Sequence, residues 1–149
     1  MQTFLPYPDF KRSASCLDNK RLNKQRVETL QILQALHNPD YGWQHHPAVK
    51  MWRGSTGYLT TYGLTICKEW ISRGYQDTCY GKILRFALSL PEDPDGDNYP
   101  FWLGDPDFHD SHKAALLFKD PEWYGRFGWN VEPKIEYVWP SNNNRRKEK

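Results

Sequence analysis

Apolar residues recur at a helical interval in the first third of the chain. The series consists of Val27, Leu30, Leu33 and Leu36. A spacing of three or four is typical of an α-helix with one side in a core. Asn38 and Pro39 end the series, and Ser13 or Ser15 is a suitable N-cap. The pattern predicts one long helix over residues 14–37.

Further helical stretches follow, separated by proline and glycine. They are a short helix from Pro47 to Gly54, a longer one ending at Arg73 and Gly74, one from Asp77 or Thr78 to Leu88 that buries Ile83, Phe86 and Ala87, and a last one from Ser111 to Phe118. The segment between Ser89 and Asp110 is rich in Pro, Gly and Asp and is predicted to be a loop. We therefore expect an all-α fold, a compact single-domain helical bundle with long irregular loops.

The size of the chain fits one domain. Its 149 residues can bury a single core, which we assign to residues 1–140, with 131–140 extended. Residues 141–149 contain no apolar side chain and are predicted to be a basic, disordered tail. No stretch is apolar enough for a membrane span, and no secretion signal is recognisable at the first residues. We expect a cytoplasmic monomer.

Charge is distributed unevenly along the chain. Residues 1–85 hold 12 Lys and Arg against 6 Asp and Glu, whereas residues 86–140 hold 4 against 11. A basic half facing phosphates is a plausible arrangement for binding nucleic acid. The alternative is two solvated faces of opposite sign. Aromatic residues make up 15% of the chain, enough to serve both a core and a recognition surface.

Several classes of site lack their sequence signatures. The three cysteines, Cys16, Cys67 and Cys79, form no CxxC pair, which favours reduced thiols. The zinc deaminase, phosphate-loop and serine-hydrolase motifs are also absent. An acidic run with Asp93, Asp95 and Asp97 is the one candidate for a metal-dependent nuclease, but a solvated acidic loop is much the better explanation of it. We expect no metal and no cofactor.

One carboxylate stands at the end of a cationic strip on the first predicted helix. Lys20, Lys24 and Glu28 are four residues apart and share a helix face, with Arg21 and Arg26 nearby. This arrangement has two interpretations. Glu28 is either a catalytic carboxylate among phosphate-binding cations or the partner of Lys24 in an ordinary surface ion pair.

Two further groups of residues can each be interpreted in two ways, as DNA contacts or as structural residues. His46 precedes Pro47 and either caps or packs at the start of a helix, or contacts a phosphate; adjacent histidines do not form a zinc site. Near the end, an arginine lies between rings, a combination that suits unpaired nucleotides or a packed core. This group comprises Trp123, Tyr124, Arg126, Phe127 and Trp129.

Three segments together resemble the pyrimidine-dimer DNA glycosylases of the phage endonuclease V type. The first is RVETLQILQAL, which contains Glu28 and is followed by HHPAV at residues 45–49. The second is CKEWISRGY, residues 67–75, and the third is SHKAALLFKDPEWYGRFG, residues 111–128. Their order and separation are similar to those in the family. The acidic loop between residues 91 and 110 has no clear counterpart.

The resemblance implies a mechanism and the residues for it. In this family the amino group of the first residue attacks C1′ of the damaged nucleotide and an internal glutamate assists, roles that fall on Met1 and Glu28. Arg21, Lys24 and Arg26 would hold phosphates, and Gln2 and Arg53 would make lesser contacts. The other predicted DNA-binding residues are Lys20, His46, Trp123, Tyr124, Arg126 and Phe127. The phage enzymes expose a threonine where this chain has Gln2, so the lesion could differ.

The expected function is a DNA glycosylase with abasic-site lyase activity that acts on damaged double-stranded DNA. An α-amine is less basic than a lysine side chain, so more of it is neutral and nucleophilic at neutral pH. The alternative is a non-catalytic nucleic-acid-binding protein that uses the same basic helix.

Overall fold

The computed structural model describes residues 1–91 and 97–140, and within them it contains helices and no strand. The helices are α1 (Phe10–Cys16), α2 (Asn19–His37), α3 (Pro47–Lys50), α4 (Thr56–Ser72), α5 (Cys79–Ser89), α6 (Pro106–Lys119), α7 (Pro121–Tyr124) and the 3-10 helix η1 (Gly125–Phe127). The prediction of an all-α fold is confirmed. No helix among the described residues is long and apolar enough to cross a membrane.

The first predicted helix is in fact two helices. Leu17 and Asp18 adopt extended backbone conformations between α1 and α2, and the Leu17 side chain is fully buried. The predicted start was also wrong. Asp9 caps α1 by accepting a 2.9 Å hydrogen bond from the backbone N–H of Arg12, whereas Ser13 lies inside the helix. An aspartate is as good an N-cap as a serine, and the sequence offered both.

The buried side of α2 differs from the predicted one. The side chains that are buried are Leu22, Gln25, Thr29, Ile32, Leu33 and Ala35. Val27 is 46% exposed. A residue turns by about 100° around an α-helix, so a strict spacing of three drifts by about 60° at each step. Val27 therefore points to solvent, Leu33 is fully buried, and Leu30 and Leu36 are partly buried against the core.

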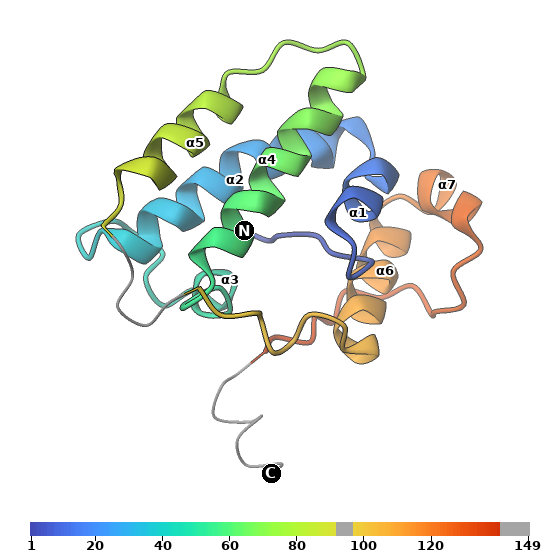
Figure 1. Cartoon of the computed structure of the whole chain (residues 1–149). Coiled ribbons are helices and arrows are strands. Elements are labelled where there is room, and N and C mark those ends of the chain that lie inside the picture. Colours follow the sequence, from blue (N-terminus) through green and yellow to red (C-terminus); the bar gives the residue numbers. More distant parts are fainter. Residues whose placement is uncertain (92–96, 141–149) are drawn as a thin grey trace.

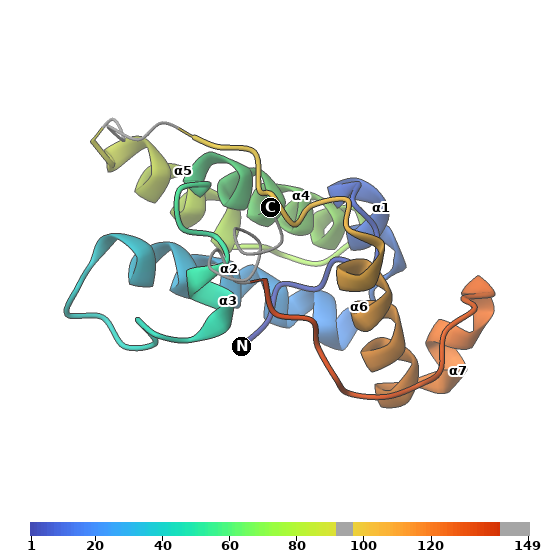
Figure 2. The same cartoon turned by 90° about the horizontal axis from the view of Figure 1, so that it is seen from below.

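Helix α4 packs against α1, α2 and α5, as Figure 1 shows. Gly63 permits the close contact between α2 and α4, because a Cβ atom at this position would lie 2.4 Å from Thr29 Cγ2. Ile83 of α5 approaches the same point, at 3.1 Å. Helices α2, α4 and α5 meet at this point, and α6 and α7 stand beside them in both views (Figures 1 and 2).

The first residues of the chain run through the interior without forming a helix. Residues 2–6 are all buried, and they lie between α2 and α6 (Figure 2). Side chains provide their hydrogen bonds. Trp52 Nε1 donates to Thr3 Oγ1 at 3.0 Å, Leu5 N donates to His112 Nδ1 at 2.9 Å, and His109 Nδ1 lies 2.7 Å from the Leu5 carbonyl oxygen.

Helix α6 begins within the predicted loop. Asp105 caps it and Pro106 occupies its first turn, so it starts before Ser111, the predicted first residue. Sequence inspection interpreted these Asp and Pro residues as loop formers, but both are typical of a helix start. Asp93, Asp95 and the predicted tail 141–149 lie outside the described residues. Residues 131–140 form no helix or strand, and in Figure 2 they return beneath α6 towards the first residues.

Candidate active site around Glu28

Glu28 extends from α2 to the first residues of the chain. Its Oε2 accepts a 2.9 Å hydrogen bond from the backbone N–H of Gln2, and Gln25 Nε2 lies 3.5 Å from the same oxygen. Lys24 Nζ is 3.9 Å from Oε1. The Lys24 side chain is 72% exposed, but that of Glu28 only 13%. The predicted ion pair between Lys24 and Glu28 therefore exists. The Glu28 carboxylate, however, is mostly buried and also binds the backbone of Gln2.

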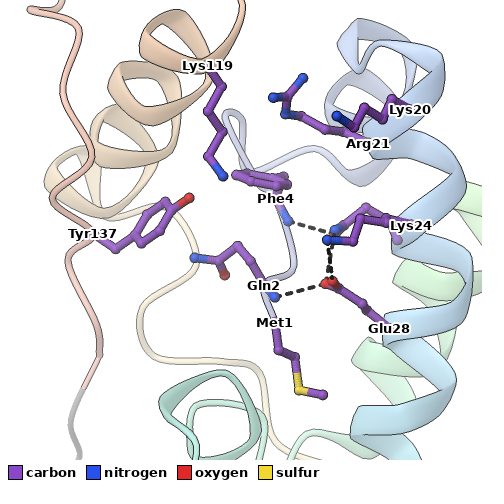
Figure 3. Close-up of a pocket in the computed structure, with 10 residues that line it drawn as sticks. Met1, Gln2, Phe4, Lys20, Arg21, Lys24, Glu28, Lys119 and Tyr137 are labelled. Atoms are coloured by element: carbon purple, nitrogen blue, oxygen red, sulfur yellow. Dashed lines mark hydrogen bonds and ion pairs between the residues drawn. The ribbon is translucent and has the colours of Figure 1, made fainter.

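A pocket of about 300 Å³ opens beside this carboxylate. Its walls come from the first residues, α2, the end of α6 and the extended segment before residue 141 (Figure 3). The lining residues are Met1, Gln2, Phe4, Lys20, Arg21, Lys24, Gln25, Glu28, Lys119 and Tyr137. Of the predicted site residues, the structure brings together Met1, Gln2, Lys20, Arg21, Lys24 and Glu28.

The pocket carries four cationic side chains and one carboxylate. Lys119 projects into it from the end of α6, opposite Arg21 (Figure 3). Burial lowers the pKa of the Lys119 ammonium, and the positive charges of Arg21 and Lys24 lower it further, while Glu28 opposes them. These shifts show that the cations repel one another across the pocket. An anion placed among them would relieve the repulsion.

Buried polar side chains fix the segment that carries Met1 into the pocket. Phe4 N donates to Gln25 Oε1 at 2.9 Å. The Tyr62 hydroxyl lies 2.7 Å from the same oxygen and 2.9 Å from the Phe4 carbonyl. Thr3 N donates to Gln2 Oε1 at 2.9 Å. Because successive backbone groups are held in this way, the position of Met1 is set by the core and not by local helix formation.

His46 caps α3 and is not among the residues that line the pocket. Its Nδ1 accepts a 3.0 Å hydrogen bond from the backbone N–H of Ala48, which confirms the capping alternative. Burial lowers the pKa of the His46 imidazole, the α-amine of Met1 lowers it further, and Glu28 raises it. His46 is therefore near enough to both groups for their charges to act on it.

Arg26 and Arg53 do not reach the pocket. The Arg26 guanidinium pairs with the carboxylate of Asp77 and lies 4.8 Å from the ring centre of Trp70. Its side chain is only 12% exposed. Arg53 donates from Nη2 to the Gln44 carbonyl at 3.2 Å. Both arginines thus have intramolecular partners away from Glu28.

The aromatic segment after α6 divides between core and surface. Tyr124 is fully buried, and its hydroxyl binds the carboxylate and backbone N–H of Asp18. Trp123 Nε1 donates to the Cys16 carbonyl at 2.8 Å. The Arg126 guanidinium lies 4.0 Å from the Trp123 ring centre and 5.5 Å from that of Phe127. This cluster is not part of the pocket, and its outer members remain accessible.

Sequence reasoning did not identify four lining residues, namely Phe4, Gln25, Lys119 and Tyr137. Gln25 had a local signal, because it lies one turn before Glu28 on the same helix. Lys119 falls inside a segment that carries the family resemblance, but nothing singled it out from other lysines. Phe4 and Tyr137 had no signal, since their place depends on the packing of distant segments.

The other candidate chemistries have little support in the described part of the chain. Cys16, Cys67 and Cys79 are free and buried, and burial raises the pKa of the Cys16 thiol to about 12, so it is protonated at neutral pH. Residues 1–91 and 97–140 contain no group of three His, Cys, Asp or Glu side chains that could hold a metal ion. Asp97 binds the backbone N–H of Gly57 at 3.1 Å.

Comparison with known proteins identifies a family for the first part of the chain. The family model for pyrimidine dimer DNA glycosylase matches residues 1–81, which is 81 of the 149 residues. No curated protein and no solved structure gave a match. The matched region includes the first residues and Glu28, whereas Lys119 and Tyr137 lie beyond it. The chain therefore belongs to the pyrimidine dimer DNA glycosylase family, whose role is DNA repair.

Proposed function

We propose that this chain excises a damaged base from double-stranded DNA and then cleaves the abasic strand, both through a covalent bond to an α-amine. The observation that supports this proposal is that Met1 and Glu28 line the same cation-rich pocket. An amine, a carboxylate and phosphate-binding cations are the groups that this chemistry needs. The protein would act as a monomer, without a cofactor.

The first step would be displacement of the base. The neutral amine of Met1 forms a bond to C1′, and the bond between C1′ and the base nitrogen breaks with its electron pair remaining on the base. The new ammonium loses a proton, and the base gains one. Glu28 stabilises the positive charge that develops on the sugar and can accept the ammonium proton.

The second step would be strand cleavage. The sugar ring opens as the bond between C1′ and the ring oxygen breaks, giving a Schiff base between C1′ and the amine, and the ring oxygen becomes a hydroxyl by taking the proton that Glu28 accepted in the first step. Loss of a proton from C2′ then forms a carbon–carbon double bond, and the 3′ phosphate leaves with the electron pair of its C–O bond. Hydrolysis releases the amine.

The pocket cations would position the damaged strand. Lys20, Arg21 and Lys24 line the pocket from α2 and Lys119 lines it from α6 (Figure 3), and they can bind phosphates on either side of the extruded nucleotide. A damaged pyrimidine pair is poorly stacked, so extrusion costs less than at an intact site. Arg126 with Trp123 and Phe127 supplies a second surface for unpaired nucleotides, while Tyr124 is too buried to take part.

The Met1 α-amine lies one residue before the backbone nitrogen that is hydrogen-bonded to Glu28. The nitrogen that donates to Glu28 belongs to the Gln2 peptide, which is not nucleophilic. If Met1 were removed, this nitrogen would itself become the α-amine, already 2.9 Å from the carboxylate. Both forms keep an amine in the pocket, and the trapping experiment below identifies which residue bears it.

Borohydride trapping tests the proposal. The protein is incubated with ultraviolet-irradiated duplex and with abasic duplex in the presence of sodium borohydride, which reduces a Schiff base to a stable adduct. We expect a covalent protein–DNA complex, with the DNA on the first peptide after proteolysis. Acetylation of the amine should abolish it. Salt-sensitive DNA binding without any adduct on either duplex would overturn the proposal and favour the non-catalytic alternative.

A further inference from the structure

The Gln2 side chain presents an unused hydrogen-bond donor at the pocket. Gln2 is only 5% exposed and lines the pocket. Its Oε1 accepts a 2.9 Å hydrogen bond from Thr3 N. Its Nε2 is buried and has no partner in the described part of the molecule. A buried polar group without a partner is rare in native proteins and calls for a specific explanation.

The hydrogen bond to Thr3 fixes which end of the carboxamide faces the pocket. Rotating the amide by 180° would place the Nε2 hydrogens against the Thr3 N–H, so that two donors would face each other. Figure 3 shows the carboxamide turned away from Glu28, towards the side of the pocket on which Tyr137 lies. The Nε2 group, with its two N–H donors, therefore has a set orientation on this side of the pocket.

Aromatic rings form the wall on the same side. Phe4 and Tyr137 both line the pocket, with ring centres 6.3 Å apart and planes at 60°. Burial raises the pKa of the Tyr137 phenol, so it stays neutral. Rings next to a single polar donor are suited to a flat, partly polar ligand such as a nucleobase.

We propose that Gln2 Nε2 binds the carbonyl oxygen next to the glycosidic nitrogen of the departing pyrimidine. The inference rests on the proposed function and names the residue that recognises the base. When the bond to C1′ breaks, the electron pair left on the ring nitrogen is shared with this neighbouring oxygen. A fixed N–H donor is worth more to an oxygen that gains negative charge than to the neutral carbonyl of the substrate.

The donor is out of contact with water in the free protein. An entering base must therefore displace the atoms that cover Nε2 in order to reach it. Pairing the nitrogen with the base then removes the penalty of leaving it unpaired, which favours a ligand with an acceptor at this point.

Two substitutions of Gln2 separate this function from a structural one. Gln2→Glu keeps the shape and an acceptor for Thr3 but removes the donor, and Gln2→Leu removes both polar atoms. We expect single-turnover excision from irradiated duplex to fall by about 10- to 100-fold in both variants, as for loss of a hydrogen bond to a charged group. The Glu variant should be the slower, because its carboxylate repels the departing base.

An abasic duplex provides the decisive control, since it has no base for Gln2 to bind. The rate of borohydride trapping at a preformed abasic site should stay within about twofold of the rate for the unmodified protein, because no hydrogen bond to a base is lost there. Gln76→Glu, at an exposed glutamine, controls for added charge. An equal loss on both substrates, or excision at the normal rate, would overturn the inference. If the unmodified protein fails on both substrates, the proposed function itself is wrong.

Discussion

Glu28 accepts a 2.9 Å hydrogen bond from the backbone N–H of Gln2, although 26 positions separate the two residues. This contact joins the middle of α2 to the segment that carries Met1. The same segment is bound one turn earlier on α2, where Gln25 accepts from Phe4 N. Helix α2 thus supplies both a carboxylate for chemistry and an amide that positions the amine.

Replacing Glu28 by Gln should separate chemistry from binding. The new amide oxygen can still accept from Gln2 N, so the first residues should keep their position. Losing the negative charge should slow excision of a damaged base by about 100- to 1,000-fold, the usual effect of removing one electrostatic group from an active site. Single-turnover kinetics on irradiated duplex measure this rate.

The matched control for that variant is Glu69→Gln. Glu69 also forms an i,i+4 ion pair on a helix, with Arg73 at 2.9 Å, but it does not line the pocket. Its substitution should leave excision unchanged. DNA affinity should not decrease in Glu28→Gln, because one negative charge has been removed from a cationic pocket. A normal excision rate in Glu28→Gln would contradict the assigned role.

The pocket cations should account for part of the salt dependence of DNA binding. Each phosphate contact contributes about 0.9 to the slope of log K against log salt. Lys20→Ala and Lys119→Ala should each reduce this slope by about one phosphate contact, as measured by fluorescence anisotropy over a salt series. Lys82→Ala, on α5 and outside the pocket, should leave the slope unchanged. Equal slopes in all three variants would argue against the pocket as the DNA-binding site.

Gln25→Leu should destabilise the fold strongly, although the two side chains have similar volumes. Gln25 is 1% exposed, and its loss leaves Phe4 N without an acceptor, whereas the Tyr62 hydroxyl can still donate to the Phe4 carbonyl. A buried group left unpaired costs about 1–3 kcal/mol. The melting temperature should fall by roughly 2–12 °C for a chain of this size. Gln76→Leu, at an exposed position, should change it little, and calorimetry of both variants tests the comparison.

Acid should destabilise the protein through His112. Its Nδ1 accepts from Leu5 N, so the neutral ring is the bound form, and burial lowers its pKa to about 3. The unfolded chain, with an ordinary histidine pKa near 6.5, binds more protons between these two values. The free energy of unfolding should therefore have its full value above about pH 6.5 and should decrease as pH falls towards 3, by at most about 5 kcal/mol.

His112→Asn tests the origin of this acid sensitivity. Asparagine does not titrate and retains an acceptor, so the slope of unfolding free energy between pH 6.5 and 3 should become shallower in denaturant titrations. Burial also lowers the pKa of His109, which leaves a residual slope of the same sign. An unchanged slope in His112→Asn would show that His112 is not the group responsible.

The parts of the fold that sequence predicted well are those set by local signals. Helix α4 ends at Ser72, followed by Gly74 with a positive φ of 93°, as the glycine predicted. The break at Leu17 was missed because its cause is distant. The extended turn inserts Leu17 into the core and places Asp18 against Tyr124, more than 100 residues later. Helix propensity carries no information about such a contact.

The part of the candidate site that lies on one helix was predictable, and the part contributed by distant segments was not. Lys20, Arg21, Lys24 and Glu28 lie within three turns of one helix, so their spacing alone placed them together. The opposite wall comes from Lys119 and Tyr137, which only tertiary packing brings to α2. Arg26 has the right charge and proximity in sequence, but helical geometry turns it to the other side, where Asp77 binds it.

The bond between Leu5 and His112 joins residues 107 positions apart, and this separation has a consequence during synthesis. A ribosome has made Met1 and Glu28 long before it reaches α6, so a nascent chain can form the contact between Gln2 and Glu28 but still lacks the histidine that binds Leu5 and the lysine that completes the pocket. The pocket should therefore be able to hold a damaged strand only after α6 has been made.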